Sequence, residues 1–387
     1  MQEGIRPIEF GGPLHAMMRL PIALVAVVAI GIVLWDAFET IVLPRRVARR
    51  WRLARLFYRL TWTPWSAVAR RIASRVQREA FLGVFGPFSL LVLLAMWAAG
   101  LILGFGVLHW SLSTTMHTPD EPPSLGTYLY VSGTTFFTLG LGDVTPRGAL
   151  ARGLTVLESG LGFGFLALVI GYFPVLYNAF SKREVSITLL DPRAGSPPSA
   201  GELLRRHGRD HLHHLDRFLH EWEQWTAELI ESHVSYPVLA YFRSQHSNQS
   251  WLAALTTILD ACALLMAGTE EGEDWQASIT FATARHAAID LAKVFHLEPR
   301  APSPDRLSSS DFARLSHLLS EAGRPPSDPK ETAQRLADLR QTYEPYINAL
   351  ADRFLMPLPV WVSPRPIKEP ADTFPDTFGT TTATRIV

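Results

Sequence analysis

Cysteine is almost absent from this chain of 387 residues, which contains only Cys262. A single thiol excludes an intrachain disulfide framework and is consistent with a cytoplasmic setting for its segment. The chain also lacks a Walker phosphate loop and a Gly-x-Gly-x-x-Gly turn of the kind that follows a strand. One glycine-rich run, Gly160 to Gly164, lies inside a long apolar stretch, so we do not interpret it as a nucleotide loop. We therefore expect a protein that is not an enzyme and has no cofactor.

Acidic residues are missing between Arg45 and Arg78, although the acidic and basic totals of the chain are equal. Basic segments beside membrane spans stay in the cytoplasm. We predict a basic cytoplasmic or interfacial helix over 45–80 that touches anionic lipid. The arginines at three-residue steps also resemble a voltage sensor, but Pro44 precedes them and further arginines interrupt the apolar filling. Nucleic-acid binding is not expected, because the run adjoins a membrane span.

Three apolar runs have close to the ~20 residues that a helical membrane span needs. They are Leu20 to Leu43, Phe88 to Trp110 and Leu154 to Phe173. The basic segment after the first run orients it inward, so a short N-terminus lies outside within a first region 1–44, and the C-terminal half lies in the cytoplasm. A cleaved signal peptide is the alternative for the first run, but its length and its two acidic residues, Asp36 and Glu39, count against it.

Between the second and third runs lies Thr138-Leu139-Gly140-Leu141-Gly142-Asp143. Glycine reaches positive φ at little cost, so a Thr-x-Gly-x-Gly run can turn successive carbonyl oxygens to one side, where they can replace the water shell of an ion. The preceding Tyr128 to Phe137 is apolar but too short to cross a membrane, which favours a re-entrant pore helix. An ordinary turn of a soluble protein is the alternative, but non-helical backbone between two spans is tolerated only where it is buried or lines a cavity.

This spacing resembles the signature of potassium channels, T-V-G-Y-G-D, with Leu139 in the place of Val and Leu141 in the place of Tyr. The resemblance covers Phe88 to Phe180 and is to bacterial channels with a two-helix pore, similar to the pore module of two-pore-domain potassium channels. It implies a pore domain at 81–180 and places Thr134 against Asp143 as a brace beside the filter. It also implies that K⁺ binds main-chain oxygens and the Thr138 hydroxyl. The implied ion-binding residues are Thr138, Leu139, Gly140, Leu141 and Gly142.

Leu141 has no hydroxyl with which to brace the filter, as the tyrosine of the family does, so selectivity can be looser. A ring of carbonyls needs several loops around one axis, and no second Gly-x-Gly-Asp occurs among apolar residues. Closed symmetry and the family precedent predict a homotetramer, or a dimer if a hidden second loop exists.

The third span carries two further predicted features. Gly160, Gly162, Gly164 and Pro174 are candidates for a gating hinge, and the alternative is small-residue packing against the neighbouring span. Glu158 is a costly charge at membrane depth. We expect it to brace the filter from behind through Ser132, Thr134 or Thr135, or to stay protonated, and we favour this over a direct ion site.

The C-terminal half is predicted to contain a linker at 181–200, a helical domain at 201–363 and a disordered tail at 364–387. Periodicity predicts helices at 212–229, 251–266, 275–295, 311–321 and 331–355. The second of these is apolar enough to be mistaken for a fourth span, but Asp260 favours a buried helix. A metal site is the less favoured interpretation of the histidines near the start of this domain, since no cysteine pair accompanies them. These are His207, His211, His213, His214 and His220.

Together these features predict an all-α membrane protein. A potassium-channel-type pore module, with a span, a re-entrant pore helix and filter, and a second span, follows one extra span and precedes a cytoplasmic helical bundle. We predict a potassium-selective channel subunit of the bacterial inner membrane, gated by its inner helix and tuned by the bundle, whose ligand the sequence does not indicate. Its expected partners are potassium ions, membrane lipids and further copies of the chain. The alternatives are a poorly selective cation channel and a non-conducting membrane sensor.

Overall fold

The computed structural model describes residues 13–43, 52–118, 122–207, 212–245, 248–268, 274–323, 325–326 and 328–363. The predicted tail at 364–387, the start of the N-terminal region and the arginines from Arg45 to Arg50 lie outside these ranges. Within them the prediction of an all-α protein is confirmed. The strands assigned there, β1 (Met116–His117) and β2 (Thr145–Pro146), are two residues long and pair with each other.

The chain divides into two compact units. Unit 1 comprises Met1–Pro64 and Pro87–Val175, and unit 2 comprises Trp65–Gly86 and Leu176–Val387. The first helices in chain order are α1 (Pro13–Ile41), α2 (Leu53–Arg71), α3 (Arg75–Ser111), α4 (Leu125–Phe136) and α5 (Gly148–Ala194). The backbones of α2, α3 and α5 each contribute residues to both units.

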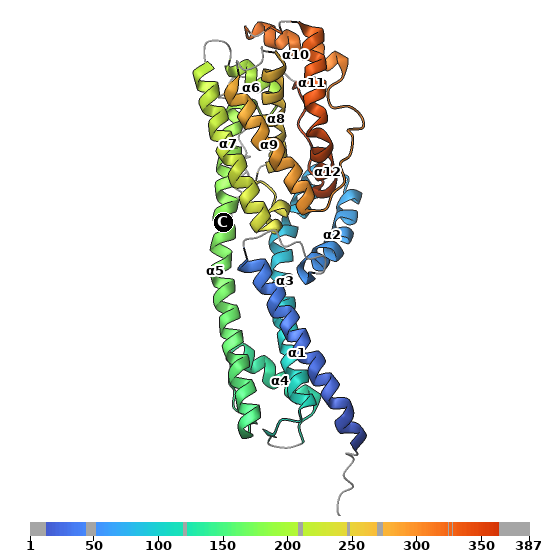
Figure 1. The fold of residues 1–387 in the computed structure, drawn as a ribbon, viewed down its shortest axis with the longest axis vertical. Helices are drawn as coiled ribbons and strands as arrows, with labels where there is room; N and C mark the ends of the chain where they lie inside the picture. Colours follow the sequence, from blue (N-terminus) through green and yellow to red (C-terminus); the bar gives the residue numbers. More distant parts are fainter. Residues whose placement is uncertain are drawn as a thin grey trace, which may run out of the picture. The chain divides into compact units, whose positions relative to one another are not determined.

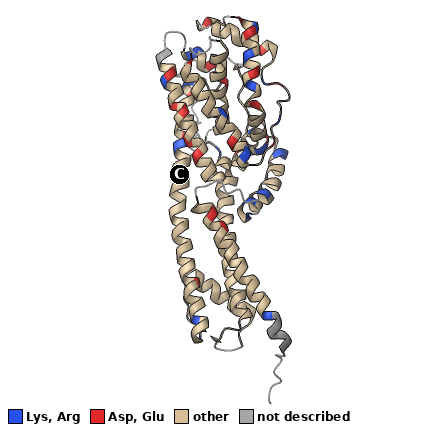
Figure 2. Ribbon diagram, viewed as in Figure 1, with Lys and Arg blue, Asp and Glu red and all other residues tan. Residues whose placement is uncertain are grey.

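Long apolar helices match the three predicted spans. Arg19–Ile41, Arg75–Ser111 and Gly148–Ala194 are each long and apolar enough to cross a membrane. Figure 2 shows how few charged residues lie along α1, α3 and the first half of α5. Trp251–Gly268 also meets the criteria of length and composition, but 89% of its most apolar window is buried inside the protein. That burial is the property of a core helix, as Asp260 led us to expect.

Unit 1 has a core where α1, α3, α4 and α5 meet (Figure 1). Ala26 and Ile30 of α1 pack with Leu101 and Phe105 of α3 and with Phe136 at the end of α4. Near the other end of α1, the buried Asp36 accepts hydrogen bonds from Trp97 Nε1 and from the backbone amide of Ala54, each at 3.0 Å. Because Ala54 lies in the first turn of α2, the carboxylate caps that helix and fixes where it begins.

Unit 2 is a helical bundle built around α8 (Trp251–Gly268). Its other helices are α6 (Ala200–His207), α7 (Leu212–Ser235), the 3₁₀ helix η2 (Pro237–Tyr241), α9 (Trp275–Val294), α10 (Ser309–Glu321), α11 (Pro329–Gln341) and α12 (Glu344–Phe354). Helices α7, α8 and α9 lie side by side, and α11 and α6 also pack on α8 (Figure 1). Nearly every residue of α8 is buried, which explains why its sequence is apolar on all sides.

Two elements of the C-terminal half differ from the sequence expectations. The helix expected at 331–355 is two helices, since α11 ends at Gln341 and α12 begins at Glu344. Pro345 explains the break, because proline has no amide donor and is tolerated only in the first turn of a helix. The segment expected as a linker at 181–200 is helical up to Ala194, because α5 continues that far.

The segment Trp65–Gly86 belongs to unit 2 although it precedes the second span in the chain. Trp65 stacks on Phe81 with ring centroids 4.4 Å apart, and Phe85 contacts Tyr241 at 5.2 Å. Arg243 forms an ion pair with Glu79 at 3.4 Å. Unit 2 is therefore assembled from two separate stretches of the chain.

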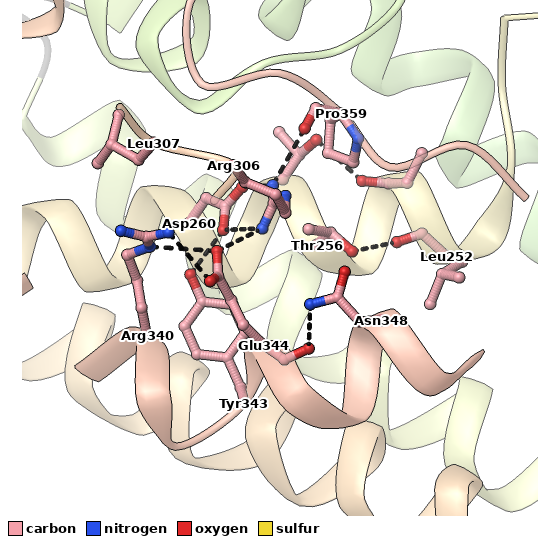
Figure 3. Close-up of polar contacts among 12 residues, drawn as sticks. Leu252, Thr256, Asp260, Arg306, Leu307, Arg340, Tyr343, Glu344, Asn348 and Pro359 are labelled. Atoms are coloured by element: carbon pink, nitrogen blue, oxygen red, sulfur yellow. Dashed lines mark hydrogen bonds and ion pairs between the residues drawn. The ribbon is translucent and has the colours of Figure 1, made fainter. Parts of the chain in front are cut away.

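A polar network lies in the core of unit 2 around Asp260 of α8 (Figure 3). Arg306 donates to Asp260 Oδ2 at 2.5 Å and to Glu344 Oε1 at 2.8 Å, and Tyr343 donates to Asp260 Oδ1 at 2.6 Å. Arg340 donates to the same Glu344, at 3.1 Å. Burial alone would lower the pKa of Arg306, but the Asp260 carboxylate beside it raises that pKa above its ordinary value. The network thus supplies partners for the carboxylate of Asp260, the charged residue in the middle of the apolar helix α8.

Candidate ion filter and pore helix

Helix α4 is the predicted pore helix, and its ends are defined by local hydrogen bonds. Ser124 is the N-cap, and its hydroxyl accepts from the Thr127 amide while the Thr127 hydroxyl accepts from the Ser124 amide, which is a capping box. At the other end the Phe137 amide donates to Gly133 O and closes the last turn. The helix has 12 residues, too few to cross a membrane, as the sequence indicated.

The filter segment leaves the C-terminal end of α4 without a gap. Thr134 O accepts the amide of Leu139 at 2.7 Å and, more weakly, that of Gly140 at 3.5 Å. The Thr138 amide donates to Thr135 O at 3.0 Å. These bonds satisfy carbonyls that the helix end would otherwise leave open, and they fix the start of the filter to the pore helix.

Positive φ angles alternate along the filter segment. Thr138, Gly140 and Gly142 have φ of +55°, +54° and +81°, whereas Leu139 and Leu141 between them do not have positive φ. This alternation turns successive peptide units so that their carbonyl oxygens can face one side. A β-branched residue in the left-handed region is an outlier that costs about 1–3 kcal/mol and occurs mainly at functional sites. Thr138 is such an outlier, and it stands at the first position of the predicted filter.

The residue after the filter, Asp143, is held by a tyrosine. The Tyr130 hydroxyl donates to Asp143 Oδ2 at 2.8 Å. Thr134, which we expected to contact Asp143, instead donates its hydroxyl to Val131 O at 3.0 Å. Sequence reasoning missed Tyr130 because it lies one helical turn before Thr134, and only the length of a tyrosine side chain brings its hydroxyl to the loop.

The loop that follows the filter is joined to the segment after α3. Strands β1 and β2 pair antiparallel, with Met116 opposite Pro146 and His117 opposite Thr145. The Tyr128 hydroxyl of α4 donates to Thr114 O at 2.8 Å. Both ends of the pore loop are therefore attached to the segment that follows α3.

Glu158 of α5 lies behind the pore helix and is fully buried. Its Oε1 is hydrogen bonded to the Ser132 hydroxyl of α4, the first of the partners we expected. Its Oε2 lies 4.0 Å from Nε2 of the buried His109 of α3. The His109 side chain was missed by sequence reasoning, because a lone histidine at the end of an apolar run gives no signal of its partner.

The glycines of α5 lie in two different environments. A Cβ at Gly162 would lie 2.1 Å from Phe136 O and 2.9 Å from Phe136 C, so α5 touches the backbone of α4 at this point. A Cβ at Gly160, Gly164 or Gly171 would meet nothing within 4 Å. Helix α5 is continuous through all of these positions and through Pro174. Close packing accounts for Gly162, although against the pore helix rather than the neighbouring span that we expected, and the hinge role of these residues stays a prediction.

The filter itself is exposed in a single chain. Leu139 and Leu141 are 61% and 64% exposed, and the residues from Phe137 to Asp143 are all exposed. Within the described residues of one chain, this segment is therefore left uncovered.

Histidines of the C-terminal half do not form a metal centre in the part of the chain that the structure describes. No group of three or more His, Cys, Asp or Glu there could hold a metal ion. His207 binds Leu203 O through Nδ1, and His220 lies beside Glu223. The side chains of His211 and His213 lie outside the described residues, so the metal interpretation is not tested at those positions.

Comparison with known proteins agrees with this geometry. Residues 91–177 match a family model described as "Ion channel". The chain contains an ion-channel pore domain. This pore domain begins within α3, includes α4 and the run Thr138–Asp143, and ends within α5. The family is one of ion channels rather than enzymes, and the chain is a multi-pass membrane protein.

Two bacterial proteins resemble the chain. An uncharacterized membrane protein of Bacillus subtilis, YdjJ, is 25% identical over 195 residues, which are 49% of this chain and 56% of that protein. Protein LctB of Geobacillus stearothermophilus is 31% identical over 87 residues, which are 20% of this chain and 64% of LctB. The chain thus spans less than two thirds of the length of either relative. No solved structure matches it.

Proposed function

We propose that the chain is a subunit of a potassium-selective channel of a bacterial inner membrane, with four copies around one pore. The alternating positive φ angles at Thr138, Gly140 and Gly142, within an ion-channel pore domain, carry this proposal. The carbonyls of Thr138 to Gly142 and the Thr138 hydroxyl would replace the water shell of K⁺. The negative end of the α4 dipole points toward the start of the filter and favours a cation there.

Gating and orientation follow from the same proposal. The inner helix α5 would open and close the pore, with Gly160, Gly162, Gly164 and Pro174 as the positions where it can bend. Helix α2 contains four arginines and no acidic residue, which supports a cytoplasmic location for this helix and for the bundle of unit 2. Asp143, Thr134 and Glu158 would brace the filter from outside the ion path.

Reversal potentials test the selectivity. Purified protein in planar bilayers with K⁺ on one side and Na⁺ on the other is expected to give a reversal near the K⁺ equilibrium value. A reversal near zero would instead support a poorly selective cation channel, which Leu141 makes the main alternative. Absence of current at all pH values tried would support the non-conducting sensor.

Gly142→Ala is expected to abolish the current, because a side chain at φ +81° is strained and the carbonyl would turn away. Ala149→Gly, at an exposed position just after the loop, is the control and is expected to conduct. Mixing equal amounts of variant and wild-type subunits counts the copies. A tetramer blocked by one altered loop retains roughly one sixteenth of the current, and a dimer about a quarter. Full current in pure Gly142→Ala would contradict the filter.

Lipid binding is the second part of the proposal, and the exposed face of α2 supports it. Leu56 and Leu60 are 52% and 63% exposed, the exposed Arg59 lies between them, and the exposed Arg71 lies at the C-terminal end of the same helix. Apolar and basic side chains on one face are typical of helices that lie in the surface of an anionic membrane.

Adding phosphatidylglycerol to the protein in detergent is therefore expected to raise its thermal midpoint more than phosphatidylcholine does. The double variant Arg59→Gln, Arg71→Gln is expected to lose much of this difference, since each arginine near an anionic surface contributes about 1 kcal/mol. Arg217→Gln, at an exposed arginine of α7 paired with Glu221, is the control. Equal lipid effects in the double variant and the control would contradict the assignment.

A further inference from the structure

Two buried ionisable side chains, Glu158 and His109, lie close together behind the pore helix. Glu158 of α5 and His109 of α3 are both fully buried, with Oε2 and Nε2 4.0 Å apart. Neither of these two atoms has a hydrogen-bond partner among the described residues. A buried ionisable atom without a partner is costly, so each specific case calls for a physical reason.

The hydrogen bonds of Ser132 favour a protonated Glu158. Its hydroxyl is within bonding distance of two oxygens, Ile102 O at 2.8 Å and Glu158 Oε1. A serine has one hydroxyl proton, so it can donate to only one of them. If it donates to Ile102 O, its oxygen must accept from Glu158, and the carboxyl group then carries a proton on Oε1. This arrangement satisfies all three groups, whereas an ionised Glu158 leaves Ile102 O and the carboxylate competing for one donor.

The other side of the pair can also exchange a proton. His109 Nδ1 lies 2.9 Å from the Thr114 hydroxyl, which also lies 3.3 Å from His109 O. If Thr114 donates to Nδ1, then Nε2 carries the ring proton and points its donor at Glu158. If Thr114 donates to the carbonyl, Nδ1 carries the proton and Nε2 offers a lone pair. Both neutral forms of the ring are therefore compatible with the same positions of the atoms.

Other ionisable groups on the packed elements are engaged elsewhere. From α1, Arg19 lies over the Trp110 ring at 5.9 Å and donates to Ser113. From α4, Tyr128 stacks beside His109 but gives its hydroxyl proton to Thr114 O, and Tyr130 binds Asp143. On the first half of α5 the other charged residue, Arg152, is exposed.

We propose that His109 and Glu158 form a proton-binding site. Relative to a neutral imidazole beside an ionised carboxylate, the site binds one further proton that can dissociate. Occupied by that one proton, which lies on Glu158, the pair has no net charge. Loss of the proton leaves a buried carboxylate, and gain of a second leaves a buried imidazolium, and either charge is unfavourable in this setting. Because the site joins α3, α4 and α5 directly behind the filter, its charge state controls how the pore helix is held.

The consequence is a bell-shaped pH dependence of conduction, with the current falling about tenfold for each pH unit beyond either limit. This statement rests on the proposed channel function. Glu158→Gln keeps a donor for Ser132 but cannot ionise, so it is expected to conduct and to lose the alkaline limb. His109→Gln is expected to lose the acid limb. His117→Gln, at an exposed histidine of β1 on the same loop, is the control and is expected to keep both limbs.

A measurement without current separates this site from the channel function. Infrared spectra of the purified wild-type protein at neutral pH are expected to contain the carbonyl band of a protonated carboxylic acid, which Glu158→Gln removes. The thermal midpoint is expected to fall at high pH in the wild type but not in that variant. Identical spectra and identical pH profiles would overturn the site even if K⁺ current is found. A silent bilayer with the expected infrared difference would overturn the channel and keep the site. If Glu158→Gln does not assemble, the test is the pH profile of His109→Gln. Loss of the acid limb in that variant supports the site, and an unchanged acid limb overturns it.

Discussion

Gly162→Ala is expected to abolish channel activity and to destabilise the pore domain, whereas Gly153→Ala is expected to preserve both. The reason is the approach of α5 to the end of α4, where a Cβ at Gly162 would lie 2.1 Å from Phe136 O. The obstacle is backbone, so no rotation of a side chain can relieve it, and the two helices must separate. Phe136 is 3% exposed and lies two residues before Thr138, so a displacement there changes the position of Thr138.

The control variant makes this comparison sharp. Gly153 lies on the same helix outside the proposed hinge positions, and a Cβ there would meet nothing within 4 Å. Alanine there also favours the helix by roughly 0.5–1 kcal/mol relative to glycine. K⁺ flux into liposomes and the thermal midpoint in detergent are the measurements. If Gly162→Ala kept its stability and lost only the frequency of opening, Gly162 would be a hinge rather than a packing contact. Equal flux and equal stability in the two variants would contradict both the packing role and the hinge role of Gly162.

Arg306→Ala is expected to lower the free energy of unfolding of unit 2 by about 3–5 kcal/mol, since it leaves two buried carboxylates without their main partner. Asp260 and Glu344 are 1% and 2% exposed, and both accept from Arg306. Burial raises the pKa of Glu344, and the positive charge of Arg306 opposes that shift. The same guanidinium donates to Pro359 O and lies over the Trp361 ring, so the segment after α12 is expected to loosen as well.

Hydrogen exchange reports this effect locally, which matters because the chain has two units. Amides of α8 and α12 are expected to exchange on the order of 10²–10⁴ times faster in Arg306→Ala. Arg300→Ala is the matched control, because the pair between Arg300 and Asp352 is largely exposed and such pairs contribute about 0–1 kcal/mol. Exchange in Arg306→Ala no faster than in Arg300→Ala would show that the buried network does not hold the bundle.

The sequence predicts those parts of this protein that depend on local pattern. The three spans are apolar over a fixed length and were found from the chain alone, and the positive φ angles at Gly140 and Gly142 fall at the glycines of the predicted filter. The short α4 was also recognised from local pattern, since an apolar run that is too short to cross a membrane and lies between two spans is typical of a re-entrant helix.

Contacts between distant residues were harder to predict. Ser132 was one of several candidates for Glu158, while His109 and Tyr130 gave no signal, because their partners are set by how α3, α4 and α5 pack. The continuation of α5 to Ala194 was missed, since Asp191 and Pro192 suggested a linker although tertiary packing keeps the chain helical there. The assignment of Trp65–Gly86 to unit 2 has no local signature at all.

That last assignment has a consequence for how the protein is made. Trp65–Gly86 leaves the ribosome before the second span, whereas Tyr241 and Arg243, the partners of Phe85 and Glu79, are synthesised long afterwards. Throughout that interval the aromatic side chains of Trp65–Gly86 lack the later residues that pack on them in the folded protein, while the neighbouring spans are being inserted into the membrane. Biogenesis therefore cannot proceed one domain at a time, and a chain truncated after α5 would be exposed to proteases at Trp65–Gly86, a part of the protein it still contains.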